Sequence, residues 1–76
     1  MKDELYEIIK NLVEDVDAIS IKEVEGEHSV ILELKVAQNE MGKIIGKQGK
    51  VARAIRSIMK ACAIKRGKMV MVEFVD

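Results

Sequence analysis

The first half of the chain changes from a helical to an alternating pattern of apolar residues. Residues 3 to 15 carry an apolar stripe at helical spacing, and Asp3 is a plausible N-cap. The period then shortens to two, which predicts strands over residues 18 to 24 and 29 to 36. Between them, residues 25 to 28 form a glycine-containing turn. The residues assigned to the core faces are Leu5, Ile8, Ile9, Leu12, Val13, Val16, Ile19, Ile21, Val30, Leu32, Leu34 and Val36.

The second half predicts two helices separated by a turn, followed by a final strand. Asn39 is a suitable N-cap for a short helix over residues 40 to 45, and a long helix runs from the turn to about Lys65. Arg66 and Gly67 are typical of a helix C-terminus. The last strand covers residues 69 to 75. The long helix is expected to bury one stripe, formed by Val51, Ile55, Ile58 and Cys62 and flanked by Ala52, Met59 and Ala63.

The turn between the two helices carries the strongest functional signal. Gly46 and Gly49 bracket Lys47 and Gln48, and glycine permits positive φ angles and close approach of another chain. The first N–H groups of the following helix have no partner within that helix, and the helix dipole favours an anion there. Lys47 and Lys50 add positive charge. The turn is therefore a candidate phosphate site.

Other glycine motifs fit less well. A Walker P-loop requires a second glycine five residues after the first, and Lys47 stands at that distance from Gly42. A dinucleotide fingerprint requires glycine in place of Ile44. Gly42 and Gly46 form a GxxxG pair, but no apolar run of about 20 residues surrounds it. For the GxxG loop taken alone, the alternative is a helix-turn-helix corner that needs glycine only for its backbone conformation.

Charge is divided unevenly along the chain, although the formal net charge is zero. Residues 1 to 40 contain four basic and eleven acidic residues, and residues 41 to 76 contain nine basic and two acidic residues. The net charges are therefore −7 and +7. A basic surface around the glycine turn would attract phosphate groups. The alternative is that helix faces of opposite sign pack against each other or against another copy.

Composition excludes several classes of function. A chain of 76 residues predicts one domain, and a single cysteine, Cys62, permits neither an internal disulfide nor a cysteine-rich metal site. The only histidine, His28, lies in a turn without an orienting partner. No acid, base or activated nucleophile accompanies the glycine turn, so we expect neither enzymatic activity nor a cofactor. The absence of a long apolar run or a signal peptide predicts a cytoplasmic protein.

The order of elements and the sequence from Met41 to Lys50 resemble the type II KH domain, in particular the KhpA family of small bacterial RNA-binding proteins. Ile44-Ile45-Gly46-Lys47-Gln48-Gly49-Lys50 is the most specific part, and Gln38 departs from the family by replacing an expected proline. The resemblance implies an α+β fold with helices on one face of a three-stranded sheet, as a single KH domain over residues 1–76.

The resemblance also implies that the protein binds single-stranded RNA through its GxxG loop, as an RNA chaperone or regulatory protein in cell elongation, cell shape, cell wall biogenesis and division. It implies a homodimer and a complex with KhpB, a larger KH-domain protein. The alternative is a KH-fold interaction module with little RNA binding of its own. The expected RNA-binding residues are Lys43, Ile45, Gly46, Lys47, Gln48, Gly49, Lys50 and Arg53.

Overall fold

The fold is α+β, with the predicted order of elements. The computed structural model describes residues 1–46 and 49–75. Its elements are α1 (Lys2–Lys10), a short 3₁₀ helix η1 (Val16–Ala18), β1 (Ser20–Glu25), β2 (Ser29–Lys35), α2 (Gln38–Ile45), α3 (Lys50–Lys65) and β3 (Met69–Phe74).

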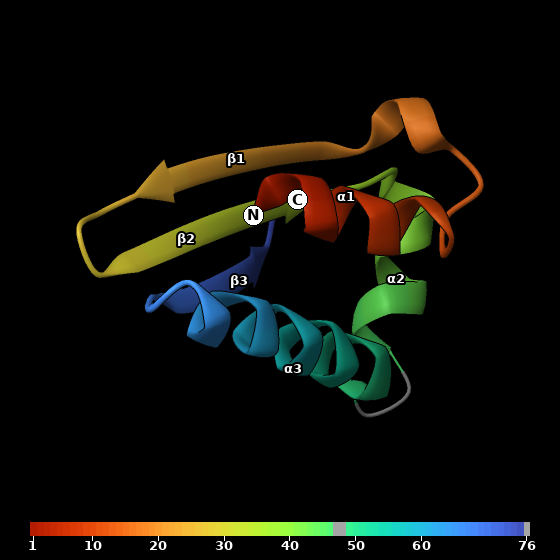
Figure 1. The fold of residues 1–76 in the computed structure, drawn as a ribbon. Helices are drawn as coiled ribbons and strands as arrows, with labels where there is room; N and C mark the ends of the chain where they lie inside the picture. The colour runs from red at the N-terminus through yellow and green to blue at the C-terminus, as the bar shows by residue number, and fades with distance from the viewer. Residues whose placement is uncertain (47–48, 76) are drawn as a thin grey trace.

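The sheet is mixed, with β2 at its centre and the strand order β1-β2-β3. β1 pairs antiparallel with β2, so that Ser20 faces Lys35, and β3 pairs parallel with β2, so that Ser29 faces Met69. The parallel pairing requires a crossover, which α2 and α3 provide. Figure 1 shows α2 at the end of the sheet where β1 begins and β2 ends.

In the described part of the chain, α1, α2 and α3 pack on one face of the sheet. The predicted inward residues of β2 are all buried, while its alternate residues Ile31, Glu33 and Lys35 point the other way and are half-buried or exposed. One apolar core therefore lies between the helices and this face. Its buried residues are Leu5, Ile9, Val13, Val30, Leu32, Leu34, Val36, Met41, Ile44, Ile55, Met59 and Val72.

The first helix is shorter than predicted. α1 ends at Lys10 rather than near residue 15, and Leu12, expected in the core, is 45% exposed. The N–H groups of Glu14 and Asp15 bond to the Glu40 side chain instead of to helical carbonyls, which draws this segment away from the helix axis. Asp3 lies inside α1 and is not its N-cap, because the helix starts one residue earlier.

The starts of β1 and α2 also differ from those expected, and η1 was not predicted. Ala18 belongs to η1, so β1 starts at Ser20. α2 starts at Gln38 with Ala37 as its N-cap, and no side chain caps it. Asn39 therefore lies in the first turn of α2, not at its cap.

The buried stripe of α3 is rotated from the predicted one. Ile55 is buried as expected, but Ala52, Met59 and Ala63 complete the stripe, whereas Ile58 is 48% exposed and Cys62 is half-buried. Both rows have helical spacing and are apolar, so periodicity alone could not choose between them.

The end of α3 was predicted correctly. Gly67 has a φ of 70°, and the N–H of Lys68 bonds to the carbonyl oxygen of Ala63 at 2.9 Å. The N–H of Gly67 bonds to the carbonyl oxygen of Ile64 at 3.0 Å. These two bonds form a Schellman motif, which turns the chain directly into β3.

Candidate nucleic-acid interface

The two glycines of the turn are required for different reasons. Gly49 has a φ of 73°, in the left-handed region that favours glycine, as predicted. Gly46 has a φ of −66°, so the expectation of positive φ is wrong for it. Glycine is needed at position 46 because a side chain does not fit there: a Cβ at Gly46 would lie 2.4 Å from the carbonyl oxygen of Gly42. Lys47 and Gln48, also expected to bind RNA, lie outside the described residues.

Helix α3 begins at this turn without a side-chain cap. Its N-cap is Gly49, which has no side chain, and the first turn of α3 contains no acidic residue. Among residues 1–46 and 49–75 no side chain caps the first backbone N–H groups, so they can meet an anion, which the helix dipole favours. Lys50 and Arg53, both exposed, place positive charges at the same helix end.

Ion pairing divides the described basic residues of the second half. Lys43 lies within ion-pair distance of Glu40. Arg66 and Lys68, beyond the far end of α3, pair with Glu4 and Glu25 of the acidic half. Residues of opposite charge therefore pack against each other at this end of α3, which agrees with the alternative interpretation of the uneven charge distribution. Within the described residues, no carboxylate lies within ion-pair distance of the basic side chains along α3, which are Lys50, Arg53, Arg56, Lys60 and Lys65.

An open groove of about 570 Å³ lies beside the turn and is lined by residues from both α2 and α3. Two of the predicted residues, Lys43 and Gly46, line it, and Ile45 beside them is 46% exposed. Ile45 is not among the described lining residues, so the groove takes its cation from Lys43 and its apolar surface from Val51. Its described lining residues are Asn39, Gly42, Lys43, Gly46 and Val51.

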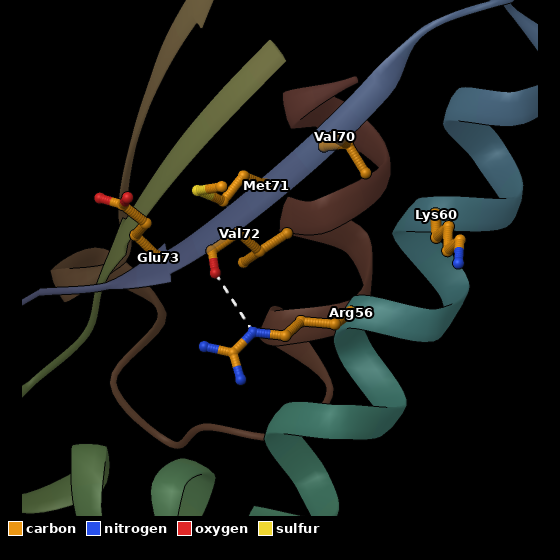
Figure 2. Close-up of a pocket in the computed structure, with 6 residues that line it drawn as sticks. All are labelled: Arg56, Lys60, Val70, Met71, Val72 and Glu73. Carbon is orange, nitrogen blue, oxygen red and sulfur yellow. Dashed lines mark hydrogen bonds between the residues drawn. The ribbon is translucent and has the colours of Figure 1, made fainter. Parts of the chain in front are cut away.

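A second groove, of about 400 Å³, lies between α3 and the edge strand β3 (Figure 2). Arg56 and Lys60 contribute from α3, and β3 contributes residues 70 to 73. Arg53, Arg56 and Lys60 are spaced by three and four residues, so they share one helix face that leads from the turn to this groove. Arg56 was not among the RNA-binding residues expected from the sequence.

Glu40 stabilises the position of α2 beside the site, and the sequence analysis did not predict this role. Its side chain is 4% exposed, and its two carboxylate oxygens accept hydrogen bonds from the N–H groups of Glu14, at 2.6 Å, and Asp15, at 3.0 Å. These bonds, with a smaller contribution from Lys43, lower the pKa of Glu40, although burial opposes them. Glu40 thereby fixes α2 to the segment after α1. Lys43 Nζ lies 3.8 Å from its Oε1.

Replacing Glu40 with glutamine is expected to lower the melting temperature by several degrees at neutral pH, because the amide NH₂ would face a backbone N–H donor. A lowered folded pKa stabilises the fold above the unfolded value, near 4.5, and this contribution is lost as the pH falls through the folded pKa. The difference in melting temperature between the parent protein and Glu40→Gln should therefore shrink below about pH 4.5. Thermal melts from pH 7 to pH 3 measure it.

The matched control is Glu33→Gln, which makes the same change on the sheet face that points away from the helices. A Glu40→Gln protein that melts with the parent at neutral pH would contradict the structural role of Glu40. An equally large fall in the melting temperature of Glu33→Gln would also contradict this role.

The remaining candidate chemistry is limited. Residues 1–46 and 49–75 contain no group of three or more histidine, cysteine, aspartate or glutamate side chains able to hold a metal ion. His28 is exposed and has Glu27 3.9 Å away. Within the same residues, each helix is too short or too polar to cross a bilayer.

Comparison with known proteins agrees with this architecture. The family model of the KhpA/KhpB KH domain matches residues 2–74. The chain is 53% identical to the RNA-binding protein KhpA of Clostridium acetobutylicum, over 99% of this chain and 100% of the relative. It is 55% identical to the KhpA protein of Clostridium perfringens, over 95% and 97%, and 43% identical to that of Aquifex aeolicus, over 100% and 96%. No solved structure matches the chain significantly.

These relatives are named as RNA-binding proteins and not as enzymes, which agrees with the expectation that this chain is not an enzyme. The match extends over nearly the whole chain and includes both the glycine turn and the two grooves. The chain therefore belongs to the KhpA/KhpB family of KH domains.

Proposed function

We propose that this protein binds single-stranded RNA at the turn between α2 and α3, as a cytoplasmic RNA chaperone or regulatory protein made of a single KH domain. The observation that carries the proposal is the position of Lys50 and Arg53, which have no described carboxylate partner, at the uncapped start of α3. A phosphate there would meet backbone N–H groups and two cations together. The names of the relatives support RNA as the source of that phosphate.

The apolar surface beside the turn favours single strands over duplexes. The bases of a single strand can turn toward the protein, whereas those of a duplex are stacked inside it. Ile45 offers aliphatic surface, and the chain has only two aromatic residues, Tyr6 on α1 and Phe74 on β3. Stacking on aromatic rings, worth about 1–3 kcal/mol per base, therefore contributes little. We expect modest affinity from one domain.

RNA binding is expected to depend steeply on salt. The logarithm of the affinity should fall with the logarithm of the salt concentration, with a slope of about −0.7 for each phosphate neutralised on a single strand. Fluorescence anisotropy with a labelled single-stranded RNA, from low to high salt, measures this slope. A blunt RNA duplex of matched length is the control, and equal or tighter binding of the duplex would contradict the proposed substrate.

A second candidate function, dimerisation or recruitment of a partner, is favoured by the rotated stripe of α3. Because Ile55 and Met59 face the core, Ile58 is left exposed on the surface next to Cys62. We propose that this face supports a homodimer or a complex with a KhpB-type partner. Two linked domains would raise RNA affinity through effective concentration, which a weakly binding domain needs.

Sedimentation on the same salt series separates the two functions. Association through apolar surface should hardly weaken as salt rises, because salt screens charges and does not reduce apolar burial. RNA affinity that lacks its own salt slope and only follows dimerisation would favour the interaction-module alternative.

A further inference from the structure

Arg56 bridges the second groove from α3 to β3. Its Nε donates a hydrogen bond to the carbonyl oxygen of Val72, at 3.3 Å, and its guanidinium carbon lies 4.9 Å from the centre of the Phe74 ring. The first contact fixes the position of the side chain, and the second restrains the plane of the guanidinium group. Arg56 is therefore held by two contacts of its guanidinium group with β3.

The position of β3 explains why the carbonyl of Val72 is available to Arg56. β3 is an edge strand, and the N–H groups of Met69 and Val75 bond to His28 and Leu34 on the β2 side. In a parallel ladder alternate residues turn their backbone groups to the neighbouring strand, so the even-numbered residues of β3 present theirs to the free edge. The carbonyl of Val72 belongs to this free edge.

The bond through Nε leaves the two terminal nitrogens of Arg56 as a fork of donors. In the described part of the chain they have no hydrogen-bond partner, and Figure 2 shows them turned away from α3. Because a guanidinium group donates and never accepts, this fork suits two neighbouring acceptors on one edge of a base. The groove, at about 400 Å³, falls within the usual range of about 300–1,000 Å³ for small-molecule sites.

We propose that Arg56 determines base preference in the bound RNA by selecting a base with two adjacent acceptors, and guanine above all. Guanine presents O6 and N7 to such a fork, whereas adenine presents one acceptor and one donor on the same edge. The inference rests on the proposed function, because it assigns a specificity to the RNA bound at the glycine turn. Phosphate contacts at Lys50 and Arg53 position the strand, and Arg56 reads one base.

The experiment compares RNA heptamers that differ at one central position in an otherwise all-uridine strand. The parent protein should bind the heptamer with central guanine about five- to tenfold more tightly than those with adenine or uracil. Replacing that guanine with 7-deazaguanine, which lacks N7, should remove most of the preference. A cytosine heptamer also offers two neighbouring acceptors, N3 and O2, and tighter binding of cytosine than of guanine would overturn the assignment of guanine.

Arg56→Lys is the decisive variant, because it keeps the charge and removes the planar fork. The ratio of guanine to adenine affinity should fall to about one in this variant. Arg53→Lys makes the same change one turn earlier and should leave the ratio intact, whatever it does to overall affinity. Thermal melts confirm that both variants are folded.

The outcomes distinguish the two proposals. A parent protein that binds every heptamer equally well overturns the inference on Arg56 and leaves the proposed function standing. A guanine preference that persists in Arg56→Lys also overturns it. A parent protein that binds no RNA at low salt overturns both.

Discussion

Replacing Lys50 and Arg53 together with glutamate is expected to weaken binding of single-stranded RNA by about 100-fold or more at low salt. Two unit charges 4 Å apart in water interact with about 1 kcal/mol, and each replacement changes the charge by two units. Allowing for screening, a loss of about 2–3 kcal/mol, or roughly 100-fold, is a conservative expectation. Anisotropy titration with one labelled RNA measures it.

The fold should survive this double replacement. Both residues are exposed in the first turn of α3, where acidic side chains interact favourably with the helix dipole. A loss of RNA binding would therefore report on the interface and not on unfolding, which thermal melts can verify.

The matched control is the double variant Lys22→Glu with Lys35→Glu. It makes the same change in net charge, on strand residues that are also exposed. These residues belong to the sheet face opposite the helices, so RNA binding should fall only by the general effect of net charge. Equal losses in the two double variants would indicate attraction to the whole molecule and would remove the start of α3 from the mechanism.

Local patterns were sufficient to predict most of the fold. The alternation in β2 identifies its buried face because side chains in a strand have a period of two, and Gly67 identifies the end of α3 because a Schellman motif needs a left-handed residue. The orientation of α3 was not predictable in this way. It carries two apolar rows, and only packing against the sheet and the other helices shows that Met59 is buried and Ile58 exposed.

The residues of the candidate site also divide into those that a local sequence motif predicts and those whose role depends on distant partners. Lys43, Gly46 and Lys50 could be assigned because the motif that names them is continuous in sequence. Glu40 and Arg56 could not, because their partners lie 25, 26 and 16 residues away. A buried acid in the first turn of α2 has no local signal that distinguishes it from a solvated one.

Alanine replacements at Gly42 and Gly46 are expected to change stability in opposite directions, although both glycines belong to the same short segment. Gly42 lies inside α2 with nothing within 4 Å of the position of a Cβ, so alanine should stabilise the protein by about 0.5–1 kcal/mol through its higher helix propensity. At Gly46 the new Cβ would lie 2.4 Å from the carbonyl oxygen of Gly42. The resulting strain should cost about 1–3 kcal/mol.

Each kcal/mol shifts the melting temperature of a domain of this size by about 4–8 °C, so thermal melts of the two variants should move clearly apart. Relieving the contact at Gly46 requires the end of α2 to shift, and the turn to α3 with it, so Gly46→Ala should also weaken RNA binding. A Gly46→Ala protein with unchanged stability but weakened RNA binding would contradict the internal contact. It would show instead that glycine is needed there for the approach of the RNA backbone, the reason that the sequence alone suggests.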